Sequence, residues 1–214
     1  MIILIGSEKG GVGKSTLATN ISALLTAQGK DVILVDSDRQ STSANWAQDR
    51  LETNKKKIEC VRQYENIKQT LQGLDTRYDI VVVDCQGRDS KELRTGLLAA
   101  HISITPFRPS QWDLDTLPTM SEMISDAKDL NPHLKAYAVI TMSPTNPQIN
   151  ELSQARACFK NYPMIKLIET AICDRKVYRD AGSLGLGVNE MSNDKATMEI
   201  LNMVKEILKD FYDS

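Results

Sequence analysis

The chain has 214 residues, of which 41% are hydrophobic and 25% are charged, and both fractions are ordinary for soluble globular proteins. This composition excludes a disordered chain, a collagen-like repeat and a small disulfide-rich protein, and the length predicts a single domain over residues 1–214. The formal net charge of −2 provides no overall positive field that would attract nucleic acid, so a polyanion would have to bind a local basic patch.

The apolar runs are too short to cross a membrane. The run Ile80–Val83 has the length of a strand, far below the roughly 18 residues of a spanning helix. The first residues, Met1–Gly6, lack the basic stretch of a signal peptide, so we expect a cytoplasmic protein. The four cysteines form no Cys-x-x-Cys pair, which favours reduced thiols over disulfides or a zinc site.

Strand-like apolar runs alternate with helix-like segments from one end of the chain to the other. This pattern is typical of an α/β protein, and we expect a doubly wound, mostly parallel sheet of about seven strands with helices on both faces. The predicted strands are Met1–Gly6, Asp31–Ser37, Ile58–Val61, Tyr78–Asp84, Ile102–Pro106, Ala136–Met142 and Met164–Ile168.

Two helices can be predicted from periodicity. Leu17, Ile21 and Leu24 have helical spacing between the first two strands, and Gly29 follows as a helix stop. Near the end of the chain, apolar residues recur every three to four positions behind a cluster of capping residues, 192–194. They are Ala196, Ile200, Met203, Val204, Ile207, Leu208 and Phe211. Acidic residues balance the lysines of this helix, so we expect its apolar side to pack against the sheet rather than a membrane.

A glycine-rich segment joins the first predicted strand to the first predicted helix. Its glycines allow the backbone N–H groups to face a phosphate, and the start of a helix near Lys14 attracts anions. Lys14 is expected to reach the β and γ phosphates of a nucleotide, and the Ser15 hydroxyl to bind Mg²⁺. A tight turn without a ligand would explain neither residue. The predicted nucleotide-binding residues are Lys9, Gly10, Gly11, Val12, Gly13, Lys14, Ser15 and Thr16.

Two of the predicted strands end in aspartates. Asp36 and Asp38 follow one buried strand and Asp84 ends another, which places all three at the carboxyl edge of the sheet, where open α/β folds bind ligands. Asp84 fits a Walker B carboxylate that orders magnesium. Gly87 follows it at the D-x-x-G spacing of a switch loop that senses a γ-phosphate. An alternative for the first two acids is that they only cap the next helix.

Several segments resemble the ParA/MinD family of deviant Walker A ATPases. The sequence from Lys9 to Ser15 matches K-G-G-x-G-K-[ST], and Asp36–Gln40 resembles D-x-D-P-Q with Arg39 in place of the proline. Pro106–Asp113 resembles the family segment P-x-x-P-S-x-x-D. The pattern from Thr170 to Glu190 is similar to that of short, plasmid-type ParA partition ATPases. The resemblance therefore covers nearly the whole chain.

This resemblance implies a phosphate-loop NTPase that uses ATP and Mg²⁺ in a slow, partner-stimulated hydrolysis. It implies three catalytic residues, in which Lys14 binds its own nucleotide, Lys9 reaches the nucleotide of a second subunit in a sandwich homodimer, and Asp38 holds the attacking water. It also implies that Ser15, Asp36 and Asp84 form the magnesium site.

The implied function is DNA partition. The ATP-bound dimer would bind DNA without sequence preference and be reset by a ParB-like centromere-binding protein or cargo adaptor. It would be cytoplasmic and nucleoid-associated, with no membrane partner. The candidate DNA contacts are Arg175, Lys176 and Arg179, with Lys55–Lys57, Arg156 and Lys160 as weaker candidates. These residues could also form only a solvated face.

Two other functions remain open at this stage. One is a MinD-like positioning ATPase that acts on a membrane or a protein cargo. The other is a metabolic ligase or an iron–sulfur carrier on the same loop, and the scattered cysteines disfavour the carrier.

Overall fold

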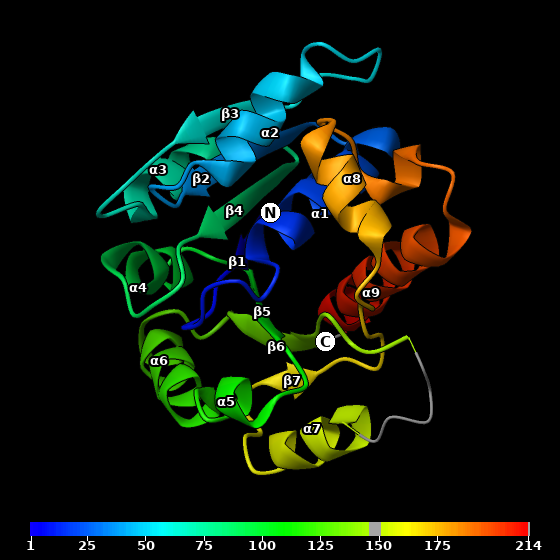
Figure 1. The fold of residues 1–214 in the computed structure, drawn as a ribbon. Helices are drawn as coiled ribbons and strands as arrows, with labels where there is room; N and C mark the ends of the chain where they lie inside the picture. Colours follow the sequence, from blue (N-terminus) through cyan, green and yellow to red (C-terminus); the bar gives the residue numbers. More distant parts are fainter. Residues whose placement is uncertain (146–150, 214) are drawn as a thin grey trace.

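The protein forms one seven-stranded sheet in the computed structural model, which describes residues 1–145 and 151–213. The strand order is β3-β2-β4-β1-β5-β6-β7, and every neighbouring pair is parallel (Figure 1). The strands are β1 (Ile2–Ile5), β2 (Val32–Ser37), β3 (Glu59–Arg62), β4 (Ile80–Cys85), β5 (Ile102–Phe107), β6 (Lys135–Ile140) and β7 (Lys166–Leu167). Each overlaps a predicted strand, so the α/β fold class predicted from the sequence is confirmed.

Helices cover both faces of the sheet (Figure 1). The hydrophobic cluster on one face includes side chains from α1, α2, α8 and α9, and the cluster on the other face includes side chains from α3, α4, α6 and α7. The helices are α1 (Lys14–Ala27), α2 (Thr42–Arg50), α3 (Lys68–Asp75), α4 (Lys91–Leu97), α5 (Gln111–Leu114), α6 (Leu117–Leu130), α7 (Glu151–Phe159), α8 (Lys176–Ser183) and α9 (Asp194–Asp213), with a 3₁₀ turn η1 (Val188–Glu190).

The central strands are apolar on both sides because both faces are covered. In β1, Ile3 and Ile5 belong to one hydrophobic cluster, whereas Ile2 and Leu4 belong to the other. This is why the strand sequences read as unbroken runs of Ile, Leu and Val rather than alternating with polar residues.

The two predicted helices are confirmed. After α1, Gly29 adopts a φ of +88°, and the Lys30 N–H donates to the Leu25 carbonyl at 3.1 Å, a typical glycine-dependent helix end. Before α9, the Asn193 Oδ1 accepts the N–H of Ala196 at 3.0 Å and caps the helix. The apolar stripe of α9, which includes Ile200, is buried in the core.

No helix in the described ranges is both long enough and apolar enough to span a bilayer.

Candidate functional site

The glycine-rich loop lies between β1 and α1, at the carboxyl edge of the sheet. Gly11 and Gly13 have φ values of +71° and +92°, which favour glycine because it has no Cβ. The Leu17 N–H donates to the Gly13 carbonyl at 2.9 Å, so α1 begins directly at the loop. The Val12 carbonyl accepts the Thr141 hydroxyl at 2.8 Å, which fixes the loop to the end of β6. The loop is therefore held open with a helix N-terminus at its base, the arrangement that suits an anion.

Lys14 is held in this loop by a backbone carbonyl. Its Nζ donates to the Lys9 carbonyl at 2.9 Å, and the Ser7 hydroxyl donates to the same oxygen at 2.9 Å. The Lys14 side chain is mostly buried, and this burial lowers its pKa, an effect opposed by the nearby charges of Asp84 and Asp38. The site thus places a pre-positioned cation where the phosphates of a nucleotide would bind.

Asp36 organises the loop that leads to α2. It is a register neighbour of Asp84 on the adjacent strand, and both side chains are fully buried. One carboxylate oxygen accepts the Asp38 N–H at 3.0 Å and the other accepts the Ala44 N–H at 2.7 Å. Burial raises the pKa of Asp36, and these two hydrogen bonds oppose the shift. Asp36 therefore has the helix-end role that the sequence left open, and it positions Asp38 through the backbone.

Asp84 has one bonded and one free carboxylate oxygen. Its Oδ2 accepts the Ser43 hydroxyl at 2.6 Å, whereas Oδ1 is buried without a hydrogen-bond partner among the described residues. Burial raises the pKa of Asp84 to about 7, against the lowering effect of Ser43 and Ser15. A free carboxylate oxygen beside a serine hydroxyl fits Mg²⁺, which takes few protein ligands and completes its shell with water and phosphate oxygens. In the described part of the chain, no group of three His, Cys, Asp or Glu side chains could hold a metal ion by itself.

Gly87 brings the loop after β4 into contact with the glycine-rich loop. A Cβ at this position would lie 2.8 Å from the Lys9 carbonyl oxygen and 2.9 Å from the Lys14 Nζ, which is closer than real contacts allow. The next residue, Arg88, donates its N–H to the Ser7 carbonyl at 3.2 Å. The predicted switch glycine therefore touches both lysines of the predicted phosphate site.

These residues line one open cleft of about 790 Å³. The structure brings together there all the predicted nucleotide-binding residues except Val12, with Asp38 and Gly87, while Asp36 and Asp84 lie buried beneath. The lining is Glu8, Lys9, Gly10, Gly11, Gly13, Lys14, Ser15, Thr16, Asp38, Arg39, Gln40, Gln86, Gly87, Arg88 and Met142. A smaller hollow of about 100 Å³ also involves Gly13 and Thr16, and is bounded by Leu17, Ile172 and Tyr178 among others.

Two polar residues of this site were not predicted from the sequence. Ser43 holds Asp84 from the first turn of α2, and Thr141 holds the glycine-rich loop from the end of β6. Thr141 could have been noticed, because it is a polar residue directly after an apolar strand, at the edge where ligands bind. Ser43 carries no such signal, because its partner is 41 positions away.

Arg39, which stands at the family's proline position, is an exposed residue of the cleft. Its guanidinium lies 3.6 Å from a carboxylate oxygen of Glu65 and 5.1 Å from the centre of the Tyr64 ring. These contacts tie the Asp38 loop to the segment after β3.

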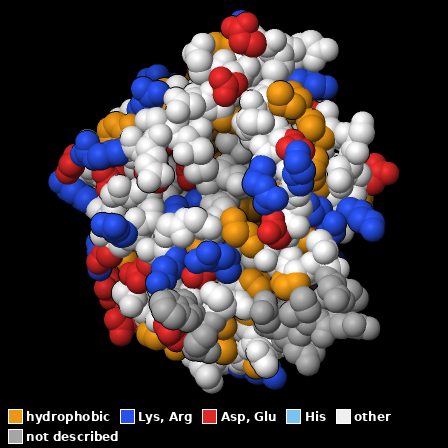
Figure 2. Space-filling model, in the orientation of Figure 1, with side chains coloured by type: hydrophobic (Ala, Val, Ile, Leu, Met, Phe, Trp, Pro, Cys, Tyr) orange, Lys and Arg blue, Asp and Glu red, His pale blue; other side chains and the backbone are white. Residues whose placement is uncertain are grey.

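The candidate DNA contacts are paired with acids. Arg175 lies 2.7 Å from Glu199, Lys176 lies 2.5 Å from Asp180, and Arg179 lies 2.7 Å from Asp174. The weaker candidate Arg156 is likewise paired, with Glu169 at 2.6 Å. On the face shown in Figure 2, Lys and Arg side chains are interspersed with Asp and Glu. The structure therefore brings the three predicted residues together at the start of α8 with their charges largely balanced.

Comparisons with known proteins agree with this geometry. The family profile described as the CobQ/CobB/MinD/ParA nucleotide binding domain matches residues 3–209. The chain is 29% identical over 210 residues to the "Maintenance of carboxysome distribution protein A" of Halothiobacillus neapolitanus, covering 96% of this chain and 95% of the relative. It is 23% identical over 199 residues to "Protein ParA" of Rhizobium radiobacter, covering 92% of this chain and 89% of the relative.

A solved structure has the same fold. It is a putative plasmid partition protein of Borrelia burgdorferi bound to AMPPNP, with a TM-score of 0.75, 21% sequence identity, and coverage of 98% of both chains.

Proposed function

The chain belongs to the CobQ/CobB/MinD/ParA family of nucleotide-binding domains, and from this premise we propose that it is a magnesium-dependent ATPase that works as a partition protein. The observation that carries the proposal is the meeting of Lys14, Ser15 and Gly87 in one cleft above the free carboxylate oxygen of Asp84. These are the parts that phosphoryl transfer requires, namely a phosphate cradle, a metal site and a loop that can respond to the terminal phosphate.

The cleft would hold the triphosphate along the glycine-rich loop. Residues 9–16 surround the phosphates, with Lys14 at the β and γ positions, and the smaller hollow beside Leu17 and Tyr178 offers an apolar place for the base. Ser15 and Asp84 would hold Mg²⁺, with Asp36 supporting them through the loop that it fixes. The metal, when bound, offsets the charge of the phosphate oxygens.

We assign the task of holding the attacking water to Asp38. It lies at the cleft, and its Oδ1 accepts the Gln40 N–H at 2.9 Å, so the carboxylate faces the site from a fixed loop. Hydrolysis should be slow in the isolated subunit, because Lys14 is the one cationic side chain that we assign to the phosphates of its own nucleotide. Lys9 of a partner subunit would supply a second, which links dimerisation to the bound nucleotide.

The proposed biological role is DNA partition, supported by likeness to the partition proteins of Rhizobium radiobacter and Borrelia burgdorferi. In this role the ATP-bound homodimer binds DNA without sequence preference, and a ParB-like centromere-binding protein or cargo adaptor stimulates hydrolysis. The protein would then be cytoplasmic and associated with the nucleoid. Arg175, Lys176 and Arg179 could contact phosphates only by exchanging their acidic partners for DNA.

Electrophoretic mobility on unrelated duplex DNA tests this role. We expect a shift with ATP or a nonhydrolysable analogue and none with ADP. Lys14→Ala should abolish the shift, and Lys9→Ala should uncouple it from dimerisation. Equal mobility with all three nucleotides would contradict the DNA role while leaving nucleotide binding untouched.

The second candidate role is positioning of a protein cargo. The likeness to the carboxysome distribution protein of Halothiobacillus neapolitanus favours it, since the alignment covers nearly all of both chains. Pull-down of an adaptor in the presence of ATP but not ADP, with no effect of unrelated DNA, would support this role over DNA partition. Pelleting with liposomes distinguishes DNA partition and protein-cargo positioning from a role at a membrane. Turnover of a small metabolite would identify a ligase.

A further inference from the structure

Arg88 is a cation at the cleft that no acidic residue neutralises. Lys14 is bonded to the Lys9 carbonyl and Arg39 is paired with Glu65, but Arg88 makes no ion pair within the described parts of the chain. Arg62 and Arg77 are also exposed and without an ion pair among the described residues, but neither lines the cleft. The exposed or half-exposed arginines paired with an acid are Arg39, Arg94, Arg108, Arg156, Arg175 and Arg179. Arg88 therefore differs from the other unpaired arginines in its position, because it lines the predicted phosphate site.

The backbone of Arg88 is fixed to the phosphate loop. Its N–H donates to the Ser7 carbonyl at 3.2 Å, and the preceding Gly87 lies against Lys9 and Lys14. Its φ of +120° is a conformation that residues other than glycine rarely adopt. Strain of this kind persists where the surrounding structure imposes it and is common at functional sites. Arg88 must therefore move together with the loop that carries Lys9.

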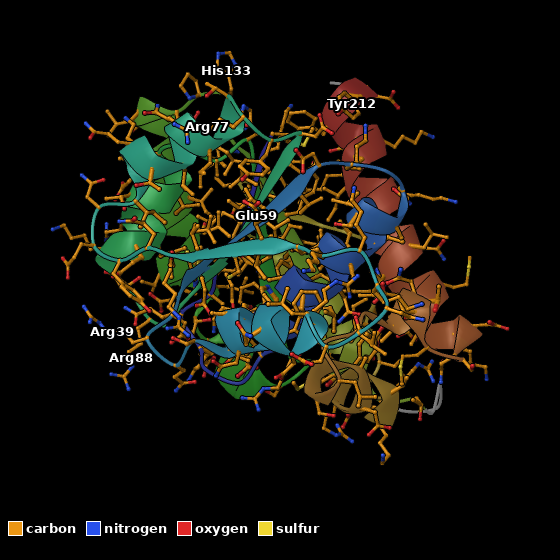
Figure 3. All side chains as sticks on the ribbon, turned by 90° about the horizontal axis from the view of Figure 1, so that it is seen from above. Arg39, Glu59, Arg77, Arg88, His133 and Tyr212 are labelled. Atoms are coloured by element: carbon orange, nitrogen blue, oxygen red, sulfur yellow. The ribbon has the colours of Figure 1, made fainter. Side chains whose placement is uncertain are left out.

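The side chain points outward rather than into its own site. Figure 3 shows Arg39 and Arg88 projecting from the same corner of the molecule, away from the ribbon. Lys14, in contrast, is buried at the base of the cleft. A side chain that extends from the rim of the cleft can contact a second molecule that binds over the cleft.

We propose that Arg88 is a catalytic residue in trans, which contacts the terminal phosphate of the nucleotide bound by a second copy of this chain. The inference rests on the sandwich homodimer of the proposed function and adds a second cation to the one assigned to Lys9. A guanidinium suits this task because it is always charged and binds two phosphate oxygens at once.

The charges of the assembled site call for another cation. ATP brings about four negative charges and the Asp38 and Asp84 carboxylates about one each, whereas Mg²⁺, Lys14 and the Lys9 of the partner subunit bring about four positive ones. The site therefore keeps a negative excess that a further cation would reduce, and Arg88 is an unpaired cation at the same cleft as Lys9.

The role of Arg88 in the step is electrostatic. The water oxygen bonds to the terminal phosphorus, the bond to the bridging oxygen breaks with its electron pair leaving on ADP, and Asp38 takes the proton of the water. Arg88 forms no covalent bond and offsets the charge that develops on the phosphate oxygens.

Arg88→Gly tests the proposal without a risk of added strain, because glycine accepts the positive φ. We expect the steady-state kcat for ATP to fall at least about tenfold, a conservative loss for an arginine at a transferred phosphate, with nucleotide affinity changed less than about twofold. Arg77→Ala is the matched control, because Arg77 is likewise exposed and without an ion pair among the described residues but lies outside the cleft, and the kcat of this variant should equal that of the wild type. An unchanged kcat in Arg88→Gly overturns the proposal.

Mixing variants tests whether the contact crosses the dimer. Alone, Arg88→Gly should keep at most about a tenth of wild-type activity and Asp38→Ala should be inactive. In the mixed dimer, the Arg88→Gly subunit keeps Asp38 and receives Arg88 from its partner. An equal mixture should therefore recover about a quarter of wild-type activity, since half of the dimers are mixed and each has one complete site.

The outcomes separate this inference from the proposed function. Wild-type protein that forms an ATP-dependent dimer in sedimentation, together with a mixture no more active than Arg88→Gly alone, overturns only the role of Arg88 in trans. Absence of an ATP-dependent dimer in the wild type overturns both.

Discussion

Asp84 should make the nucleotide-free protein less stable as the pH rises. Its carboxyl group is fully buried, and burial raises its pKa from 3.8 to about 7. Between these two values the folded protein holds a proton that the unfolded chain has released, so the free energy of unfolding falls with increasing pH. The shift corresponds to a loss of about 4 kcal/mol in the free energy of unfolding between about pH 4 and pH 8. At pH 8 the carboxyl group is ionised in both the folded and the unfolded state.

Asp84→Asn removes this titration while preserving the shape of the side chain. At pH 5 the variant should already be more stable by about 1.5 kcal/mol, because the Asp84 carboxyl group of the unfolded wild-type chain is mostly ionised there. At pH 8 the variant should be more stable, by up to about 4 kcal/mol, because it carries no buried charge. Taking the difference between the two proteins cancels groups common to both, including Asp36, whose pKa burial also raises.

Urea denaturation of both nucleotide-free proteins from pH 5 to pH 8 measures this difference. If the gap between variant and wild type is the same at both ends of the range, Asp84 is not the titrating group and the reasoning fails. Magnesium provides a second readout, because the metal requires the ionised carboxylate. With ATP present, the apparent Mg²⁺ affinity of the wild type should fall towards about tenfold per pH unit below pH 7, since binding then releases a proton.

Three further substitutions test other contacts. Gly87→Ala places a Cβ 2.8 Å from the Lys9 carbonyl oxygen, so the loop must shift. The ATPase rate should therefore fall about 100-fold, and an unchanged rate would refute a tight contact between the two loops. Glu190→Gln leaves the Arg50 guanidinium, which is 1% exposed, without its buried ion pair. The free energy of unfolding measured in urea should fall by about 3–5 kcal/mol, and a fall below about 1 kcal/mol would contradict this reasoning. Ile200→Ala empties a fully buried position on α9 and should cost about 2–5 kcal/mol in thermal unfolding, and a marginal loss would mean that the helix contributes little to the core.

Local patterns in the sequence determined much of the fold and the phosphate loop. The strands are predictable because a parallel sheet covered on both faces requires unbroken apolar runs such as Ile80–Val83. The positive φ of Gly11 and Gly13 and the placement of Lys14 at the start of a helix follow from neighbouring residues alone. These features depend on chain geometry over a few residues, so the printed sequence is sufficient to predict them.

The partners of the charged side chains depended on the tertiary structure. Asp84 bonds Ser43 rather than a residue of its own strand, and the charge of Arg175 is balanced by Glu199, 24 positions away. The sequence offered Arg175 as a DNA contact, because a cluster of basic residues does not reveal which acids will lie beside it. Such pairs are fixed by the order of the strands and by the helices packed over them, which bring together residues with no local relation along the chain.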